Sequence, residues 1–444
     1  MDAVEQGRNP TAIGRKILRE DPVCDACTGR LLADRSFGLT NVERGKSMRI
    51  AACLKDDTPY EPVDQMACWV CEGHCSRVDE WARLVEEAVE DVAFETYQVG
   101  CRVPPLLAEN DRLLRESLGL ADDAGELLKS ELNREVGKRV GEGTGTMVDF
   151  DRPDILALLH LERNHVEVSI NPAFVYGRYR KEERDIPQTE WPCQDCGASG
   201  KQLGNQGEEP CSGCDGTGYR YDVSVEGLTV PHVVEAMDGE EGLFHGAGRE
   251  DVDARMLGRG RPFVIEVKQP HRRTPDVEML QETINAAANG AVTVDELTLA
   301  TYEMVERVKE LDASKRYEAT VAFGEEVTDE ALQRAVKTID GTTVTQFTPR
   351  RVDHRRANLT RERTVYAIDG VLKSPTEATI SIHGEGGLYV KELISGDDGR
   401  TKPSLAGELS VPAEVTALDV IDVEGEEEAF LLPEYVRSGD AVEE

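Results

Sequence analysis

Four Cys-x-x-Cys pairs constrain this chain more than any other feature of its sequence. The spacing lets both sulfurs of a pair face one metal ion, and two pairs supply the four thiolates of a tetrahedral zinc site. The pairs form an early and a late group, which comprise Cys24, Cys27, Cys68 and Cys71, and Cys193, Cys196, Cys211 and Cys214. We therefore predict two structural zinc sites that hold their segments together and perform no chemistry.

The two groups differ in how firmly their spacing defines the ligands. Fourteen residues separate the late pairs, and glycines follow each of them, as in the tight turns of a zinc knuckle. Forty residues separate the early pairs, and His74 and Cys75 lie close enough in sequence to be alternative ligands. A redox dithiol is the competing interpretation of any single pair, but four pairs in two groups favour metal.

The chain is strongly acidic overall but contains local clusters of basic residues. Its 444 residues carry a net charge of -35, yet they include 37 arginines against 14 lysines. Acid spread along the whole sequence is typical of adaptation to molar salt, where the Debye length is about 3 Å and net charge no longer governs binding. Local clusters then matter more. The run PRRVDHRRANLTRER has six arginines, and we expect it to contact nucleic-acid phosphates through Arg350, Arg351, Arg355 and Arg356.

Several function classes are excluded by what the sequence lacks. No apolar run approaches the length of a membrane span, and the first residues show no secretory signal, so we expect a cytoplasmic protein. No glycine-rich dinucleotide motif follows a strand and no Walker sequence occurs, so we expect no organic cofactor.

The periodicity of apolar residues predicts an α+β protein with a mixed or antiparallel sheet. Residues 1–80 look loop-rich. Helices are predicted at 80–100, 122–140 and 294–311, with a further helix capped by Thr328. Strands are predicted within 150–180 and at 262–268, 317–323, 364–368, 377–382 and 416–423.

The loop GREDVD, residues 248–253, is the strongest candidate for a reactive site. Arg249 can hold the carboxylate of Asp251 ionised and oriented, which suits a nucleophile or a general base. Asp253 is the local competitor. A hard-metal site is disfavoured because arginines alternate with the acids, and a surface turn with a structural ion pair is the plain alternative.

Three motifs in order resemble those of pseudouridine synthases. GREDVD resembles the catalytic turn, KRYEATV (315–321) the second motif, and GGLYVKELISGDDGRTKPSL (386–405) the third. With GRPF after the aspartate, the arginine run and the N-terminal cysteine pairs, the chain is most similar to the pseudouridine synthase ten family. That resemblance implies the pseudouridine synthase catalytic fold at 226–444, a zinc-binding segment at 1–80, a THUMP-type α/β RNA-binding domain at 81–184 and a second zinc module at 185–225.

The resemblance also implies an activity and residue roles. The expected reaction converts uridine to pseudouridine in the T-loop of tRNA, at positions 54 and/or 55, by a monomeric enzyme with tRNA as its partner. Asp251 matches the catalytic aspartate and Tyr317 the tyrosine that stacks on the target base. Arg249, Lys391 and Leu418 match the arginine of the motif, the basic partner of the aspartate and an apolar wall of the base pocket.

Two alternatives stay open from the sequence. A non-catalytic zinc-containing tRNA-binding protein would use the same basic and cysteine-rich segments. A chaperone-like zinc protein is suggested by CSGCDGTG, although that repeat occurs only once in good form and no His-Pro-Asp signature accompanies it.

Overall fold

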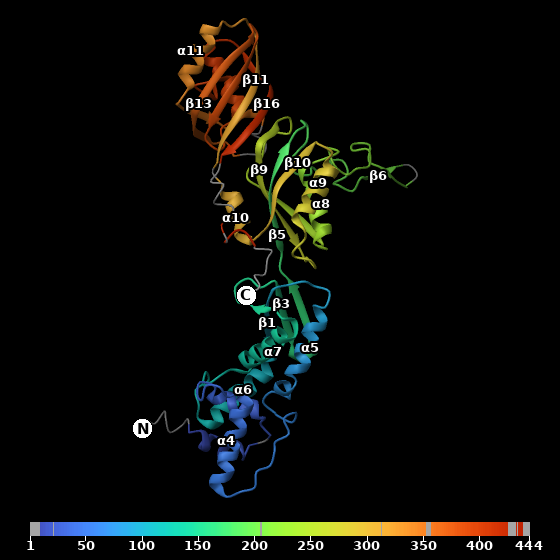
Figure 1. Ribbon diagram of the computed structural model, residues 1–444, viewed down its shortest axis with the longest axis vertical. Coiled ribbons are helices and arrows are strands. Elements are labelled where there is room, and N and C mark those ends of the chain that lie inside the picture. Colours follow the sequence, from blue (N-terminus) through green and yellow to red (C-terminus); the bar gives the residue numbers. More distant parts are fainter. Residues whose placement is uncertain are drawn as a thin grey trace. The chain divides into compact units, whose positions relative to one another are not determined.

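The computed structural model divides the chain into two compact units, which are described separately (Figure 1). It describes residues 9–20, 22–204, 207–311, 313–351, 357–424, 432 and 434–437. Unit 1 comprises Met1–Pro172 with His271–Arg273, and unit 2 comprises Ala173–Pro270 with Thr274–Glu444. No helix in these described ranges is both long and apolar enough to cross a membrane.

Unit 1 combines helices with a four-stranded sheet of order β2-β1-β3-β4, in which β3 and β4 are antiparallel. Its helices are α2 (Pro10–Ile17), α3 (Asp25–Gly29), α4 (Asn41–Asp56), α5 (Val78–Ala88), α6 (Pro105–Leu118) and α7 (Leu128–Thr144). Its strands are β1 (Thr96–Arg102), β2 (Met147–Val148), β3 (Ile155–His160) and β4 (His165–Ile170). The apolar stripe of α5, centred on Trp81 and Val85, is buried against α7 and β4.

Two glycines allow α3 and α4 to touch through their backbones. A Cβ at Gly45 would lie 1.9 Å from the carbonyl oxygen of Asp25, and one at Gly29 would lie 1.8 Å from that of Asn41. No side chain fits such an approach. The contact fixes α3, which carries the first cysteine pair, against the longer helix α4.

Unit 2 is built around one large sheet with helices on both faces. Its helices are α8 (Val225–Ala236), α9 (Val277–Ala288), α10 (Tyr302–Glu310), α11 (Asp329–Ile339), α12 (Val390–Ser395) and α13 (Leu405–Leu409). The strands of the sheet are β5 (Ala173–Lys181), β8 (Glu241–Gly246), β9 (Arg255–Lys268), β10 (Val292–Ala300), β11 (Ser314–Phe323), β12 (Thr343–Phe347), β13 (Thr360–Ser374), β14 (Glu377–Gly384), β15 (Thr401–Lys402) and β16 (Ala413–Glu424).

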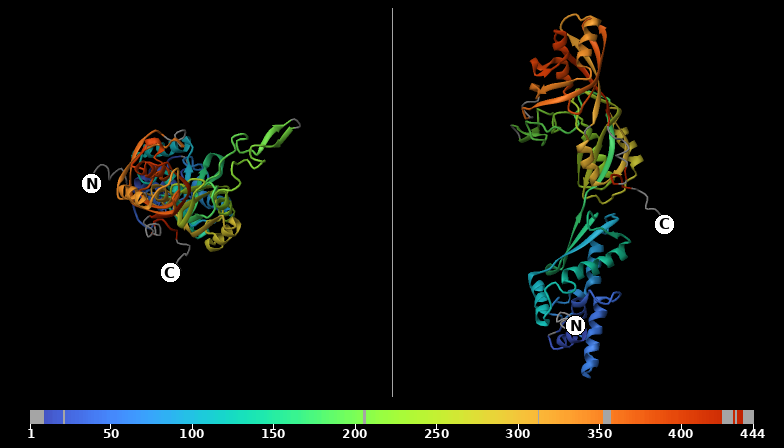
Figure 2. Two further views of the ribbon diagram at one scale, coloured as in Figure 1. Left: turned by 90° about the horizontal axis from the view of Figure 1, so that it is seen from above. Right: turned by 90° about the vertical axis from the view of Figure 1, so that its left-hand side faces the viewer.

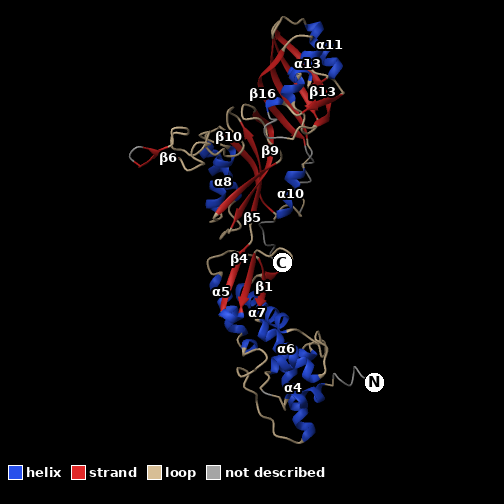
Figure 3. Cartoon of the chain, turned by 180° about the vertical axis from the view of Figure 1, so that it is seen from behind, coloured by secondary structure: helices blue, strands red, loops and turns tan. Residues whose placement is uncertain are grey.

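The order of the sheet is β10-β5-β9-β16-β11-β14-β13-β12-β15, with β8 also paired to β9. Most pairs are antiparallel, but β9 and β16 run parallel and pair only through Asp419 with Arg255 and Val420 with Met256. Helices α8 and α9 pack on one side of β5, β8 and β10, and α10 packs on the other (Figure 3). The predicted α+β class with a mixed sheet is confirmed.

A small hairpin stands apart from this sheet. Strands β6 (Lys201–Gly204) and β7 (Gly207–Pro210) pair only with each other, and they project away from α8 and α9 (Figure 2). They connect the two late cysteine pairs. The chain enters this segment from β5, which pairs with β9 and β10. The four predicted domains, 1–80, 81–184, 185–225 and 226–444, remain predictions.

Three predicted elements are corrected. The helix at 294–311 is wrong in its first half, because Val292–Ala300 forms β10 and only Tyr302–Glu310 is helical. A bulge with Glu296 at φ 58° shifts the strand's alternation and so mimics helical spacing at Leu297 and Ala300. The helix at 80–100 ends at Ala88, and the loop-rich interpretation of 1–80 missed α2, α3 and α4.

The contact between α3 and α4 yields a stability test. We expect Gly45→Ala to lower the free energy of unfolding of unit 1 by about 3 kcal/mol or more, because the new methyl group meets backbone that cannot move aside. The matched control is Gly137→Ala on α7, where nothing lies within 4 Å of the added Cβ and helix propensity improves. Denaturant unfolding in molar KCl measures both, and equal stability of the two variants would contradict the close packing.

Candidate active site and metal centres

A cavity of about 740 Å³ in unit 2 gathers most of the predicted site residues. Six of them line it: Arg249, Asp251, Tyr317, Arg351, Lys391 and Leu418. Six further lining residues with aromatic or basic side chains were not among the predicted site residues, and these are Trp191, Arg261, Lys315, Arg361, Arg363 and Tyr389. Among all its lining residues, seven are basic and two are acidic, in a chain whose net charge is -35.

Asp251 lies in the loop between β8 and β9, and two cations hold its carboxylate. Arg351 donates from Nη1 to Oδ1 at 3.0 Å, and the Lys391 Nζ lies 3.4 Å from Oδ2. Burial opposes ionisation of this carboxyl, but the positive charges of Arg351 and Lys391 outweigh it and hold the pKa of Asp251 below its usual value. The carboxylate is therefore ionised throughout the neutral pH range.

Arg351 is itself positioned by a second carboxylate. Glu392 is buried on α12 and accepts from Arg351 Nε at 2.7 Å and from Nη2 at 3.3 Å. Because Glu392 already fixes the guanidinium group, Arg351 loses little conformational freedom when it binds Asp251. Although Arg351 belongs to the arginine run that was expected to meet phosphates, in this structure it pairs with Asp251.

Lys391 reaches the site because the start of α12 is fixed. The buried side chain of Gln346 on β12 accepts from the Tyr389 N–H and donates to its carbonyl oxygen, both at 2.9 Å. Lys391 Nζ then lies 2.7 Å from Asp253 and 3.4 Å from Asp251. Asp253 is the more exposed carboxylate of the two, with 59% of its side-chain surface accessible against 32%.

Tyr317 and Leu418 form an apolar wall of the cavity. Tyr317 on β11 pairs with Val420 of the neighbouring strand β16, which also carries Leu418. Both side chains are less than a tenth exposed. Burial raises the pKa of Tyr317 to about 12, with Asp251 adding to the rise, so the phenol stays protonated at neutral pH.

A buried ion network lies directly beneath the Asp251 loop. Glu250 is 1% exposed and accepts from Arg261 Nε at 2.9 Å and from the Tyr179 hydroxyl at 2.9 Å. Lys181 Nζ lies 3.7 Å from the same carboxylate. Lys181 also donates to the carbonyl oxygens of Asp251 at 3.2 Å and Val252 at 3.0 Å, so the network holds the backbone of the loop.

The remaining predicted arginines are distributed differently. Arg249 is exposed, and its guanidinium lies 5.8 Å from the centre of the Trp191 ring. Arg350 lies outside the cavity lining and donates to Asp398 at 2.7 Å. Arg355 and Arg356 fall outside the described residues.

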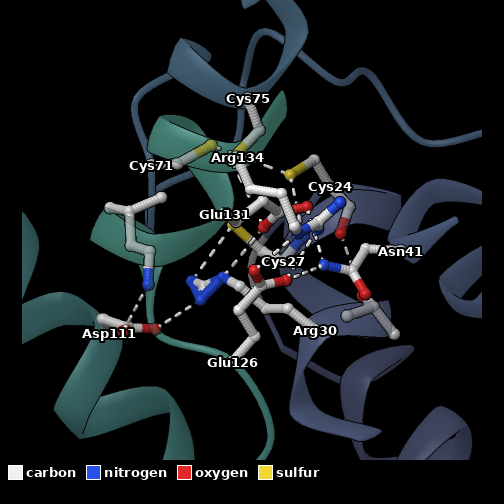
Figure 4. Close-up of polar contacts among 12 residues, drawn as sticks. Cys24, Cys27, Arg30, Asn41, Cys71, Cys75, Asp111, Glu126, Glu131 and Arg134 are labelled. Atoms are coloured by element: carbon white, nitrogen blue, oxygen red, sulfur yellow. Dashed lines mark hydrogen bonds and ion pairs between the residues drawn. The ribbon is translucent and has the colours of Figure 1, made fainter. Parts of the chain in front are cut away.

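The early cysteines form a buried group in unit 1 (Figure 4). The ligand atoms of Cys24, Cys27, Cys68 and Cys71 all lie within 4.8 Å of one another. Four sulfurs about 2.3 Å from a tetrahedral zinc lie about 3.8 Å apart, and Cys24 and Cys71 are 3.7 Å apart. Cys75 lies beside this group, and its Sγ is 4.0 Å from Glu131.

A fully buried arginine links this group to α6 and α7. Arg30 donates to the Cys27 sulfur at 3.3 Å and to Asp111 at 2.5 Å, and its Nε lies 3.5 Å from Glu131. Figure 4 shows its guanidinium between the sulfurs and these carboxylates. A four-thiolate zinc centre carries two negative charges, so this arginine offsets part of the charge that metal binding buries.

The late cysteines form a second group in unit 2. Cys193, Cys196, Cys211 and Cys214 also lie within 4.8 Å of one another, with sulfur–sulfur distances of 4.0 Å for Cys193–Cys211 and 3.7 Å for Cys196–Cys214. The pairs are bridged by matching backbone bonds of 2.8 Å, from Cys193 to Gly218 and from Cys211 to Gly200. Gly200 and Gly218 have φ values of 66° and 85°, which side chains disfavour.

The network under Asp251 yields a second stability test. We expect Glu250→Ala to lower the free energy of unfolding of unit 2 by about 3–5 kcal/mol, because Arg261 and Lys181 lose their buried counter-charge. The control is Glu241→Ala on β8, which removes an exposed partner of Lys268 and should cost little. Denaturant titrations compare the two, and a Glu250 variant as stable as the control would exclude a supporting role for the network.

Two family models cover most of the chain. Residues 174–424 match the model described as "Pus10, C-terminal", and residues 81–160 match "Pus10 THUMP domain, archaeal". A protein of Halorubrum lacusprofundi named tRNA pseudouridine synthase Pus10 is 60% identical over 98% of this chain and 100% of its own length. Proteins of the same name from Methanothrix thermoacetophila and Pyrococcus furiosus are 41% and 34% identical over 92% of this chain and over 93% and 96% of their own lengths. The resemblance found in the sequence motifs is confirmed, and the chain belongs to the Pus10 family.

Proposed function

We propose that the protein is a tRNA pseudouridine synthase, an isomerase that converts uridine to pseudouridine in the T-loop of tRNA at positions 54 and/or 55, with Asp251 as nucleophile. The observation that carries this proposal is an ionised carboxylate facing a basic cavity with one apolar, tyrosine-bearing wall. Membership of a family whose curated members are named tRNA pseudouridine synthases supports the reaction class.

The chemistry matches what these residues offer. The isomerisation breaks an N–C bond and forms a C–C bond between the same base and sugar, without redox change. It requires that the uridine leave its stack, that the base be held flat, and that a carboxylate attack the sugar or the ring. Asp251 supplies the carboxylate, and Tyr317 and Leu418 supply a wall on which the base stacks.

Arg351 and Lys391 keep the nucleophile charged until it reacts. Because both cations contact Asp251, they stabilise the carboxylate in the free enzyme, and they also lie where the negative charge returns when the product leaves. Arg351 acts through Asp251 and is in this sense a positioning residue, with Glu392 behind it.

The charge of the cavity supports RNA as the substrate. Seven basic side chains line the cavity of a chain whose overall charge is -35. The phosphate backbone of an RNA would be attracted to this cavity. The THUMP match in unit 1 supports tRNA in particular. We also propose Arg350, Arg355 and Arg356 of the arginine run as phosphate contacts. The enzyme is expected to act as a monomer.

Zinc fits both cysteine groups. The sulfur–sulfur distances of 3.7 and 4.0 Å agree with a tetrahedral four-thiolate site, and such closed sites serve structure. We propose that Cys24, Cys27, Cys68 and Cys71 hold one zinc ion and that Cys193, Cys196, Cys211 and Cys214 hold another, while Cys75 and His74 stay outside the first site.

The catalytic assignment is tested by amide substitution at the two loop aspartates. We expect Asp251→Asn to lower kcat by at least about 10³-fold while tRNA affinity is retained, because a neutral amide cannot act as the nucleophile. Asp253→Asn, which removes the nearer partner of Lys391, is the matched control and should keep substantial activity. The measurement is a pseudouridine map of an unmodified tRNA transcript after incubation in high-potassium buffer. Product from the Asp251 variant would exclude the assignment, and tRNA binding without product from the wild type would favour the non-catalytic alternative.

The metal assignment is tested by counting ions. We expect two zinc ions per chain by mass spectrometry of the metal, one after Cys214→Ser, and two after Cys53→Ser, because Cys53 is a buried thiol that belongs to neither group. Cys75→Ser should also leave two ions. A loss of zinc from the Cys75 variant, with Cys68→Ser unaffected, would show that Cys75 replaces Cys68 as the fourth ligand.

A further inference from the structure

Backbone contacts close the base of the second cysteine group. The chain enters the group at Pro192 and leaves it at Tyr219, and these two residues form a β-bridge. One residue outside this bridge on either side, the N–H of Arg220 donates to the carbonyl oxygen of Trp191 at 2.8 Å. The base of the four-cysteine module thus fixes the backbone of Trp191.

The indole of Trp191 belongs to the wall of the catalytic cavity. The ring is partly exposed. The guanidinium groups of Arg220 and Arg249 lie over the ring, 5.5 Å and 5.8 Å from its centre. Tyr221 meets the ring edge-on, with 5.6 Å between the ring centres. Arg249 comes from the Asp251 loop, so the aromatic ring stands between the cysteine module and that loop.

We propose that Trp191 is a stacking platform for an unpaired nucleobase of the tRNA next to the target uridine, and that the late cysteine module serves to hold this platform at the cavity. The inference rests on the proposed placement of catalysis at Asp251. It goes further by assigning a second base-binding position and a task for the second metal site.

The chemistry of the surroundings selects a nucleobase as the occupant. Unpaired bases in RNA loops are held on aromatic faces and arginine planes, and both kinds of surface meet at Trp191. A base that stacks on the ring displaces one of the two guanidinium groups over it, and that group can then neutralise a phosphate beside the base. The cavity volume of about 740 Å³ lies in the upper part of the roughly 300–1,000 Å³ range of small-ligand sites, which is more room than one uracil ring needs.

The test separates stacking on RNA from a packing role in the protein. Wild type, Trp191→Ala and Trp191→Phe are compared as full-length, zinc-loaded protein with an intact tRNA transcript. A stacked base contributes enough that its loss weakens binding about 5- to 150-fold. We expect the Ala variant to raise Kd and KM by a factor in this range with kcat changed less than about threefold, and the Phe variant to stay within about fivefold of wild type.

The stacked base is identified by abasic substitution. A series of tRNAs, each lacking one unpaired T-loop base other than the target, is titrated against wild type and the Ala variant. At one position the loss of the base should weaken binding to wild type but have no further effect on the Ala variant, since the contact is already gone. Equal penalties for both proteins at every position, or an unchanged Kd for the Ala variant, would overturn the proposal.

One further measurement keeps the outcome clear if the Ala variant is poorly folded. In the Asp251→Asn background, which removes turnover, tRNA should quench tryptophan emission, and Trp191→Phe should remove the part of that quenching that Trp191 contributes, since Trp81 is fully buried and only Trp69 and Trp81 remain, both in unit 1. A loss of emission on tRNA binding that is as large in the Phe variant as in the parent would contradict stacking at Trp191. This readout does not depend on catalysis, so it separates failure of the platform from failure of the Asp251 assignment.

The supporting role of the cysteine module has its own test. If the module only holds the platform, Cys214→Ser and Trp191→Ala should weaken tRNA binding by similar factors, and the double variant should bind no more weakly than either single one. Multiplying effects would show that the module contacts tRNA independently of Trp191, and would overturn this part of the inference.

Discussion

The neutralisation of one buried carboxylate underlies the reactive site of this protein. Glu250 directly precedes Asp251 in the chain, and its buried side chain contacts Arg261, Lys181 and Tyr179. An unpaired ionised carboxylate at this buried position would cost much free energy, and the three partners offset that cost. Lys181 also donates to the carbonyl oxygen of Asp251. The position of the Asp251 carboxylate therefore depends on the ion pairs that Glu250 forms with Lys181 and Arg261.

The distribution of charged residues explains how a strongly acidic chain can have a basic cavity. The chain as a whole carries a net charge of -35, which concentrated salt screens, whereas seven of the residues that line the cavity are arginines or lysines. Asp251 is held in that loop by Arg351 and Lys391, which approach from the β12–β13 connection and from α12. The ionised state of Asp251 therefore comes from short contacts that ionic strength weakens only slightly.

Sequence patterns predicted what is local and missed what is brought together by the fold. The cysteine groups were predictable because a two-residue spacer already directs both sulfurs to one point. The motif residues Asp251, Tyr317 and Lys391 were found through family resemblance, and they do line one cavity. Nothing in the spacing showed that Lys181 would support a loop seventy residues later, or that Trp191 would join it. The error at β10 arose where a bulge made a strand resemble a helix.

The parallel contact between β9 and β16 has a consequence for how the protein is made. β9 starts just after the Asp251 loop, whereas β16 ends at residue 424, and only two residue pairs join them. Leu418 and one of the two partner strands of Tyr317 are thus supplied by the last strand that the structure describes. During synthesis at the ribosome, the reactive loop is complete long before its apolar wall exists. The emerging polypeptide therefore lacks a complete catalytic cavity until β16 has been translated and has paired with β11, since such long-range pairing forms late.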